Sequence, residues 1–273
     1  MNSQTNMVSV VMPSFNSARY ISAAIESVIH QDYNEWELVV VDGGSNDDTR
    51  EIVKKFSASD FRIKLVDNVC DNGPGHARAV GISFSVGQYI AFLDADDVWL
   101  PQKISKQIRF MSESESVFTY TQYYPMDADG SRFSCAQSIH DEYGYPSYLF
   151  FRGIACSSVV AKREIFTPYI LESYGTSLAE DTYWWILIFK QGVRAVGMRD
   201  PLLLYRNTEG SLSKNRLRNQ TSVWKIYRQA FGLSTLYAGA AYISYILDVA
   251  VRRFRFMLKT IIFGKKKVSG LHQ

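Results

Sequence analysis

Cysteine is scarce in this sequence of 273 residues, and no stretch is both long and purely apolar. The three cysteines, Cys70, Cys135 and Cys156, have neither CxxC nor Cys/His spacing, so we expect no zinc site and predict reduced thiols in a cytosolic protein. The most apolar run, Leu236–Val251, contains Asp248 and falls short of the roughly 20 apolar residues of a membrane-spanning helix. The N-terminus, MNSQTNMVSVVMPSFN, lacks the basic segment and apolar core of a signal peptide, so we expect none.

A strong net charge is also missing, because 30 Lys and Arg nearly balance 27 Asp and Glu. The hydrophobic fraction of 47% and charged fraction of 21% are ordinary for a folded protein, which excludes disordered and fibrous classes. The charge is nevertheless unevenly distributed. Residues 1–209 carry 18 basic and 26 acidic side chains, whereas residues 210–273 carry 12 basic and one acidic. An acidic body with a basic tail is typical of a protein that contacts a membrane or a nucleic acid.

Apolar runs and stretches with helical spacing alternate along the first hundred residues. The apolar runs predict strands at Val8–Met12, Trp36–Val41, Ile63–Val66 and Tyr89–Leu93. The stretches between them predict helices at Arg19–Gln31, Asp47–Phe56 and His76–Val86, with Ser17 as the N-cap of the first. This alternation predicts an α/β fold with a mostly parallel sheet covered by helices on both faces.

The later part of the chain is less regular. It predicts strands at Ser116–Tyr124, Ile154–Ala161 and Val193–Met198, and a helix at Asp181–Gln191. From Gln220 to about residue 263 the pattern is helical. We therefore expect one main domain with a helical C-terminal extension.

Three carboxylates stand together directly after the fourth predicted strand, in Asp94-Ala95-Asp96-Asp97. Their mutual repulsion makes it costly to leave them unpaired in a partly buried cleft. A hard divalent cation, which takes one or two carboxylates together with substrate phosphates, removes that conflict. The alternative is a solvated acidic loop that caps the helix beginning near Gln102, but the position after a buried strand favours a metal site.

Two other polar segments follow predicted strands. Asp42 ends the second strand in VVVDGGSNDDT (39–49), where it could accept hydrogen bonds from a base or ribose, or belong only to a capping turn. The segment NGPGHAR (72–78) is a poor dinucleotide loop, because it follows the third strand and has Arg78 where the third glycine belongs. Arg78 suits a phosphate partner, the alternative being an ordinary surface arginine.

Glu180 and Asp181 open an apolar helix. Their charge could simply complement the helix dipole. A carboxylate at that position that pointed into the cleft could also serve as a general base.

Five segments of the chain resemble the family 2 glycosyltransferases, inverting enzymes with the GT-A nucleotide-sugar fold. The matching text is VSVVMPSFN (8–16), VVVDGGSNDDT (39–49), NGPGHARAVGISFSVGQYIAFLDADDVWLP (72–101), AEDTYWW (179–185) and YRNTEGSLS (205–213). Each segment alone is weak, but five in family order and at family-like spacing are specific. The resemblance implies a Rossmann-like, mostly parallel sheet flanked by helices, in a hexosyltransferase of the bacterial polysaccharide type.

The resemblance also implies which residues bind the nucleotide-sugar donor. Pro13, Phe15 and Asn16 would lie against the base, with Phe15 near its ring. Asp42 would accept from the base, commonly uracil in this family, and Arg78 would approach the base or the diphosphate.

The same resemblance implies a metal site and a base. Asp94 would contact the ribose or the metal, and Asp96 would hold the Mn²⁺ or Mg²⁺ bound to the diphosphate, with Ala95 between them at the donor. Asp97 would assist these two carboxylates at the metal site. Asp181 would deprotonate the acceptor hydroxyl, which attacks the anomeric carbon from the face opposite the leaving diphosphate, so that the anomeric centre inverts.

Two departures from the family pattern concern the donor site. Family members often carry two acidic residues where this chain has one followed by Gly43. They also often carry His where Thr208 stands, so we expect the lid to use Arg206, Ser211 or Ser213 instead.

The last part of the chain, residues 216–273, mixes basic side chains with aromatic and aliphatic ones. The basic ones are Arg216, Arg218, Lys225, Arg228, Arg252, Arg253, Arg255, Lys259 and Lys265-Lys266-Lys267. This mixture on helices predicts an interfacial segment on an anionic membrane surface. A solvated basic helix packed on the main domain is the alternative, and no nucleic-acid-binding module is visible.

The sequence therefore predicts a catalytic GT-A domain at 1–215 and a basic amphipathic helical extension at 216–273. The expected activity is transfer of a sugar from a nucleotide-sugar donor, with a UDP-sugar as the expected one, to a hydroxyl of a glycan or lipid-linked acceptor. The expected location is the cytoplasm, at the inner face of the cell membrane. A non-catalytic nucleotide-sugar-binding or assembly protein with the same fold is the alternative. The sugar, the acceptor linkage and the oligomeric state stay open.

Overall fold

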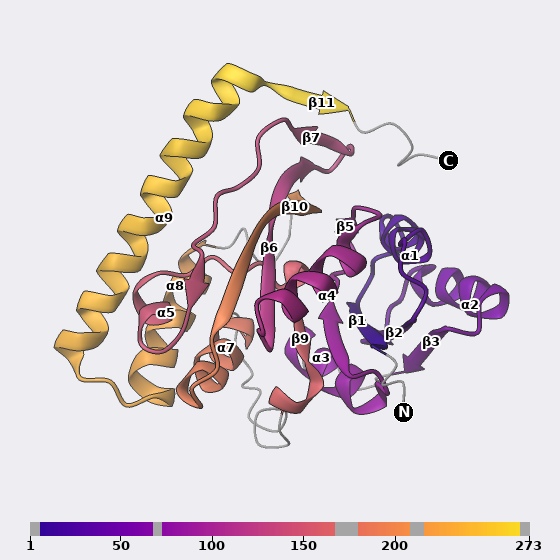
Figure 1. Ribbon diagram of the computed structural model, residues 1–273, viewed down its shortest axis with the longest axis horizontal. Helices are drawn as coiled ribbons and strands as arrows, with labels where there is room; N and C mark the ends of the chain where they lie inside the picture. Colours follow the sequence, from indigo (N-terminus) through magenta and orange to yellow (C-terminus); the bar gives the residue numbers. More distant parts are fainter. Residues whose placement is uncertain (1–5, 68–72, 167–179, 208–215, 268–273) are drawn as a thin grey trace.

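A single sheet runs through the molecule, and its first four strands are parallel (Figure 1). The computed structural model describes residues 6–67, 73–166, 180–207 and 216–267. At one end of the sheet the strand order is β3-β2-β1-β4. These strands are β1 (Val8–Ser14), β2 (Trp36–Asp42), β3 (Ile63–Asp67) and β4 (Tyr89–Phe92). The predicted α/β class is confirmed.

Helices connect these strands and cover both faces of the sheet. They are α1 (Ile21–Ile29), α2 (Thr49–Ser59), α3 (Pro74–Phe84) and α4 (Lys103–Glu113). Alternate residues of β1 enter opposite cores: Val10 packs in the cluster that contains α1 and α4, and Val11 packs in the cluster that contains α3. Every residue of β1 and β2 is buried, which explains their unbroken apolar sequences.

Beyond β4 the sheet continues with strands of mixed direction. β9 (Val160–Lys162) is antiparallel to β4 and to β6 (Phe118–Asp127), and β7 (Ser131–Phe133) is antiparallel to β6. The long strand β10 (Ala195–Asn207) runs parallel to β6. It also pairs with the short strands β5 (Val98–Trp99) and β8 (Glu142–Tyr143).

The predicted strand Ile154–Ala161 is wrong over most of its length. A 3-10 turn, η1, occupies Cys156–Ser158, and the strand begins only at Val160. Small hydroxyl side chains account for the difference, because Ser158 Oγ donates to the carbonyl of Ala155 at 2.6 Å and closes the turn.

The predicted N-cap at Ser17 is also wrong. The helix begins four residues later, at Ile21, whose N–H donates to the carbonyl of Ser17. The Ser17 hydroxyl donates to the Phe15 carbonyl instead of accepting from the helix. The chain therefore makes an extra turn between the end of β1 and α1.

Shorter helices and α7 (Glu180–Lys190) complete the main body. The shorter ones are α5 (Ser147–Phe150) and the 3-10 turn η2 (Arg163–Ile165). The helix predicted over Asp181–Gln191 is confirmed as α7, and it ends before Gly192, which has a φ of 87°. Trp184 and Trp185 of α7 are buried in the hydrophobic cluster that contains α3, so they are core residues and are not exposed for stacking on a sugar ring.

The C-terminal segment forms two helices separated by a bend. The helices are α8 (Arg216–Lys225) and α9 (Thr235–Phe263), with the π-helical turn η4 (Ile226–Ala230) between them. The short strand β11 (Lys265–Lys267) follows α9 and pairs with β7. α9 lies along one edge of the molecule (Figure 1). Ala238 and Ala241 of α9 join Tyr227 in the hydrophobic cluster around Trp184, so one side of the segment packs on the main body. Within the described residues, no helix combines the length and the hydropathy that crossing a bilayer would need.

Candidate active site

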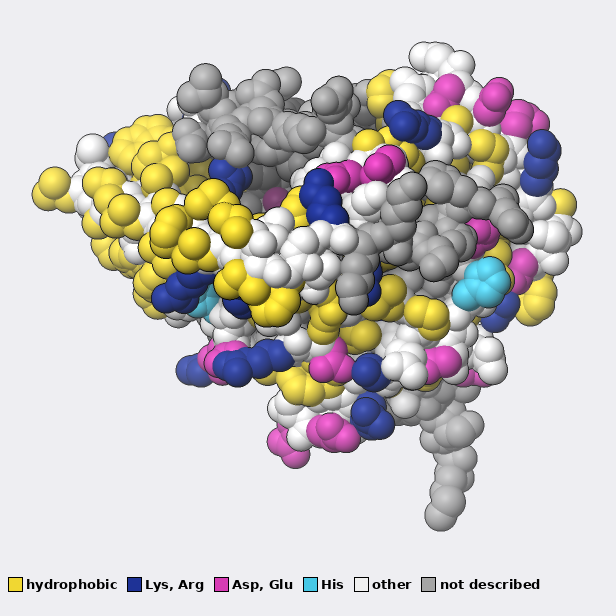
Figure 2. Space-filling view, turned by 90° about the horizontal axis from the view of Figure 1, so that it is seen from above, with side chains coloured by type: hydrophobic (Ala, Val, Ile, Leu, Met, Phe, Trp, Pro, Cys, Tyr) yellow, Lys and Arg dark blue, Asp and Glu magenta, His cyan; other side chains and the backbone are white. Residues whose placement is uncertain are grey.

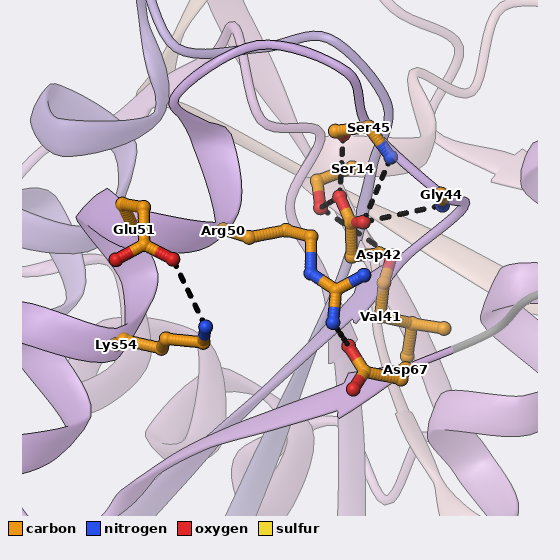
Figure 3. A network of polar contacts seen from close by, with 9 residues as sticks. All are labelled: Ser14, Val41, Asp42, Gly44, Ser45, Arg50, Glu51, Lys54 and Asp67. Carbon is orange, nitrogen blue, oxygen red and sulfur yellow. Dashed lines mark hydrogen bonds and ion pairs between the residues drawn. The ribbon is translucent and has the colours of Figure 1, made fainter.

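The carboxyl ends of the parallel strands bring polar side chains together. In the sheet register Ser14 of β1 lies beside Asp42 of β2, which lies beside Asp67 of β3 (Figure 3). Asp42 is 1% exposed, and its Oδ2 accepts the N–H groups of Gly44 at 3.1 Å and Ser45 at 2.9 Å. Its Oδ1 accepts the hydroxyls of Ser45 at 2.5 Å and Ser14 at 3.3 Å. Asp42 thus holds the turn that follows β2.

The turn after β1 lies against the turn after β2. Asn16 has a φ of 48°, its N–H donates to Ser45 Oγ at 2.9 Å, and its Oδ1 accepts the N–H of Asn46 at the same distance. Phe15 is left 50% exposed beside them, whereas Pro13 is buried in β1. The structure therefore groups Pro13, Phe15 and Asn16 with the Asp42 turn, and the exposed ring of Phe15 is available to a planar ligand.

Arg78 of α3 and Asp94, which follows β4, form an ion pair. Arg78 Nη2 donates to Asp94 Oδ1 at 2.6 Å, and Arg78 is only 8% exposed. Burial opposes the charge, but the acidic groups of Cys156 and Asp94 outweigh it and raise the pKa of Arg78 above its ordinary value. Its Nε is buried with no hydrogen-bond partner among the described residues. A charged guanidinium with an unused donor suits an anionic ligand.

The acidic residues after β4 form a turn that β10 holds in place. The N–H of Asp97 donates to the Asp94 carbonyl at 3.0 Å, and the Asp97 side chain is 1% exposed. Arg206 of β10 donates its N–H to Asp97 Oδ1 at 2.8 Å and its Nε–H to the Asp96 carbonyl at 2.7 Å. Burial, together with the charges of Asp96 and Asp94, raises the pKa of Asp97 well above its usual range. Asp97 is therefore a buried support of the turn.

Glu180 and Asp181 begin α7 close to the ion pair. Glu180 accepts the backbone N–H of Gly75 in the first turn of α3, and burial raises the pKa of Glu180 to about 7, although Arg78 opposes that rise. Burial also raises the pKa of Asp181, again against the positive charge of Arg78. Because Glu180 contacts the first turn of the helix that carries Arg78, the start of α7 lies beside the ion pair, and the charges of Arg78 and Asp94 both act on Asp181.

Comparison with known proteins identifies the family of this chain. The profile described as "Glycosyl transferase family 2" matches residues 9–164, more than half of the chain. The chain belongs to glycosyl transferase family 2. It is 31% identical, over 96% of its length and 94% of the relative's, to an Escherichia coli protein named UDP-Glc:alpha-D-GlcNAc-diphosphoundecaprenol beta-1,3-glucosyltransferase WfgD. The family and this relative make the chain a glycosyltransferase.

Solved structures agree on the fold of this glycosyltransferase. S. aureus TarS (1–349) in complex with UDP-GlcNAc superposes with a TM-score of 0.65 at 19% identity, over 92% of this chain and 73% of that one. The mannosyltransferase PcManGT from Pyrobaculum calidifontis, in complex with GDP-Man and Mn²⁺, gives 0.64 at 17% identity, over 89% and 74%. The GT-A fold expected from the sequence is therefore confirmed.

The carboxylates after β4 can supply two ligands to a divalent metal, but not a complete set. No group of three or more His, Cys, Asp or Glu side chains that could hold a metal occurs in the portion of the chain that the structure describes. Asp94 and Asp96 nevertheless flank one turn, and two carboxylates are the usual protein share of a Mg²⁺ site that substrate phosphates complete. The residues fit a metal that arrives with a diphosphate rather than a preformed metal cage.

The other predicted residues divide between the site and its surroundings. Ala95 is 5% exposed and packs in the hydrophobic cluster that contains α1 and α4, so its side chain anchors the turn to the core. Arg206 reaches the site, with its guanidinium carbon 4.5 Å from the centre of the Tyr20 ring. Ser211 and Ser213, predicted for the lid, lie outside the described residues, as does Thr208.

Two residues near the site, Ser157 and Arg152, were not predicted from the sequence. Ser157, fully buried, accepts the N–H of Asp94 at 3.0 Å through its hydroxyl, and its carbonyl accepts the indole N–H of Trp99 at 2.8 Å. The serine pair inside the apolar run 154–161 and the lone arginine between Phe151 and Gly153 are the signals that could have found them.

Proposed function

We propose that this glycosyltransferase moves a sugar from a UDP-sugar to a hydroxyl of a lipid-linked glycan, with inversion at the anomeric carbon. The observation that carries the proposal is the part-buried Arg78–Asp94 ion pair, which lies next to the start of α7, where Glu180 accepts the N–H of Gly75 from the helix that carries Arg78 and Asp181 follows. A fixed cation suits a diphosphate leaving group, the carboxylates beside it suit the divalent metal that such a group carries, and a buried carboxylate suits proton abstraction. The name of WfgD, with its UDP-Glc donor and diphosphoundecaprenol acceptor, supports the substrate class, as does the TarS complex with UDP-GlcNAc.

The donor would lie across the ends of β1, β2 and β4. Phe15 would stack on the base, and Asn16 and Pro13 would shape the turn beneath it. Asp42 already accepts four hydrogen bonds, so a base N–H would displace the longest of them, the one from Ser14 at 3.3 Å. Arg78 would donate to the diphosphate through its unused Nε–H.

Asp94 and Asp96 would hold a Mn²⁺ or Mg²⁺ ion bound to the diphosphate. Such an ion, when bound, neutralises charge that develops on the leaving group. Arg206 would keep the turn in position, since it bonds the Asp96 carbonyl and the Asp97 carboxylate from β10. The Mn²⁺ of the PcManGT complex supports a metal role without fixing which ion this chain prefers.

Asp181 would take the proton of the acceptor hydroxyl. Its raised pKa, caused by burial, brings the carboxylate nearer to the pKa at which a general base works at neutral pH. A base on the side opposite the leaving diphosphate directs attack from that side, which inverts the configuration of the sugar.

The outer side of α9 would bind the inner face of the cell membrane. Large apolar side chains that are 44 to 89% exposed recur along this helix at intervals of three, four or seven residues, namely Leu236, Ile243, Leu247, Val251, Phe254, Leu258 and Ile261. We call these seven residues the α9 stripe. Figure 2 shows hydrophobic side chains gathered at the end of the molecule where α9 lies, with basic side chains beside them. Arg253, Arg255 and Lys259 lie exposed on the same helix, and this combination suits an anionic lipid surface.

The test is transfer of sugar from UDP-sugars to lipid-linked acceptors by wild-type protein, Asp96→Ala and Asp181→Asn. We expect both variants to lose transfer by at least about 100-fold while they keep wild-type melting profiles. Asp181→Asn should still bind UDP with Mn²⁺, because its side chain lies on the acceptor side. Full activity of both variants would overturn the proposal. Binding of UDP by the wild type without turnover, over a broad panel of donors and acceptors, would favour the non-catalytic alternative.

A further inference from the structure

Arg152 is a buried arginine for which the described residues offer no carboxylate partner. It follows α5, is 6% exposed, and has two buried side-chain nitrogens, Nε and Nη2, to which the described part of the chain offers no hydrogen-bond partner. A buried guanidinium in this condition is costly, because the lost hydration is not replaced. Such a cost is expected where an anion binds and supplies the missing acceptors.

The surroundings hold the guanidinium in place but do not neutralise it. The Arg152 guanidinium carbon lies 3.6 Å from the centre of the Tyr245 ring of α9 and 5.8 Å from that of Tyr227. The nearby carboxylate of Asp248 is already shared by Arg252 at 2.8 Å and His140 at 3.1 Å. Arg252 also donates to the backbone carbonyl of Arg152, so the two arginines lie together, and of the two only Arg252 has an ion-pair partner among the described residues.

Further unused polar groups lie next to Arg152. The hydroxyl of Tyr143 is buried and has no hydrogen-bond partner among the described residues. A Cβ added to Gly153 would lie 3.1 Å from that hydroxyl and 2.6 Å from Arg252 Nη1, so the glycine lets the hydroxyl and the guanidinium approach the backbone next to Arg152. Arg152 Nε, Arg152 Nη2 and Tyr143 Oη are therefore three donors without acceptors in the described part of the chain, on residues that meet at Gly153.

This corner lies close to the helix that carries Asp181. Tyr227, whose ring centre is 5.8 Å from the Arg152 guanidinium carbon, packs in one hydrophobic cluster with Trp184 and Trp185 of α7, and the positive charge of Arg152 acts on Asp181. Arg78 is committed to Asp94 at the donor side, whereas Arg152 stands against α9.

We infer that Arg152, with Tyr143, forms a phosphate-binding site for the diphosphate of a lipid-linked acceptor. The inference rests on the proposed function and adds the chemical group by which the acceptor is recognised. A planar guanidinium gives paired hydrogen bonds to phosphate oxygens. The diphosphate bound there would hold the first sugar toward Asp181 and leave the lipid along α9. The name of WfgD, whose acceptor is a diphosphoundecaprenol, is consistent with this chemistry.

The first experiment measures anion binding without requiring activity. The full-length protein is saturated with UDP and Mn²⁺, so that the donor site is filled, and inorganic pyrophosphate is then titrated while the melting temperature is recorded. We expect pyrophosphate to raise the melting temperature of the wild type and not that of Arg152→Gln. Arg194→Gln is the matched control, since Arg194 is 73% exposed and pairs with Glu142, and it should keep the wild-type response.

Arg152→Lys covers the case in which Arg152→Gln does not fold. Lysine keeps a cation on Tyr245 but cannot give paired hydrogen bonds, so the pyrophosphate response should fall to half or less. A response that persists unchanged in Arg152→Lys, or in a folded Arg152→Gln, would overturn the site.

The second experiment distinguishes an acceptor diphosphate from a lipid head group. Arg152→Gln, or Arg152→Lys in its place, should raise KM at least tenfold for a sugar linked to a lipid diphosphate. KM for the same sugar on a phosphate-free alkyl glycoside, and for the donor, should stay unchanged. A variant that instead loses binding to phosphatidylglycerol vesicles, with the acceptor KM unchanged, would overturn the acceptor assignment. If the wild type transfers no sugar at all, loss of the pyrophosphate response would still establish the anion site, so the two proposals fail separately.

Discussion

The carboxylate of Glu180 lies against the first turn of α3, where the backbone N–H of Gly75 donates to it. A Cβ added to Gly75 would come within 2.6 Å of the Glu180 carboxyl carbon and 2.9 Å of its Cβ. A Cβ added to Gly73, which has a φ of 87°, would lie 3.1 Å from the other carboxylate oxygen of Glu180. The two glycines of NGPG therefore make room for a carboxylate from α7, and that contact fixes the start of the helix that carries Asp181.

Gly75→Ala should destabilise the protein by about 1–3 kcal/mol, because the added methyl group meets the Glu180 side chain. In a Glu180→Ala background the same change should cost clearly less. Gly239→Ala in α9 is the control, since nothing lies within 4 Å of a Cβ there, and alanine in a helix interior should stabilise slightly. Urea unfolding of the wild type, the three single variants and the double variant measures these costs. Equal costs of Gly75→Ala in both backgrounds would contradict the contact.

Glu180 should make stability fall as pH rises. Burial raises the pKa of this carboxyl from 4.5 to about 7, with Arg78 opposing and Asp181 reinforcing the rise. The native state therefore holds the proton more tightly than the unfolded chain, so this contribution is complete below pH 4.5 and is lost as pH rises toward about 7. Glu180→Gln should remove about 2 kcal/mol of that dependence, at ~1.4 kcal/mol per pKa unit discounted for residual solvent. Parallel pH–stability curves of wild type and variant would refute the assignment.

The fall in activity at low pH should come from protonation of Asp181. Burial raises the pKa of this carboxyl, so kcat should fall as pH drops through a value above that of an ordinary aspartate. Arg78 lowers the pKa of Asp181, so Arg78→Gln should move this fall toward higher pH, whereas Arg78→Lys should move it less. Profiles measured at saturating donor, so that weaker donor binding does not enter, check this. A fall that stays at the same pH in Arg78→Gln would point to another base.

Asp42→Ala should cost about 2–4 kcal/mol, because four donors of the β1 and β2 turns lose a buried acceptor. Asp42→Asn keeps one acceptor oxygen and should lose less. UDP affinity should fall in both variants if the turn positions the base. Thermal unfolding and UDP titration on the same samples separate the two effects, and wild-type stability of Asp42→Ala would show that the network contributes little.

The α9 stripe should carry the membrane contact. The double variant Leu247→Glu, Phe254→Glu places charges at two positions that are 60% and 57% exposed, so the fold should survive while sedimentation with phosphatidylglycerol vesicles falls at least tenfold. Phe61→Glu, at a position 90% exposed before β3, is the control for an added charge and should bind vesicles nearly as well as the wild type. Deletion of α9 is a poorer test, because Ala238 and Ala241 belong to the core. Unchanged vesicle binding by the double variant would rule out the stripe.

The parallel half of the fold could be predicted because its sequence repeats one pattern. Strands such as Val8–Ser14 are buried on both faces and therefore read as apolar runs, each followed by helical spacing. The half built from β6, β9 and β10 was harder. β10 runs from Ala195 to Asn207, although only Val193–Met198 was predicted, since Asp200 and Pro201 interrupt the apolar run where the pairing with β6 shifts register.

The candidate site could be predicted as far as side chains follow strands directly. Asp42 and Asp94 come at strand ends, so their convergence follows from topology. Arg152 could not be found in this way, because its surroundings come from Tyr227 and Tyr245, more than 70 residues away along the chain. No local pattern records that a buried arginine lacks a partner.

α9 has 29 residues, which at ~1.5 Å per residue makes a rod about 43 Å long. One side of this rod packs on the core and the other carries the α9 stripe. A rod of that length lying on a bilayer would hold the catalytic centre at one height above the lipid. Acceptors would then be sorted by the number of sugars between the lipid and the growing end, so that the geometry of one helix would limit the enzyme to a single step in building the glycan.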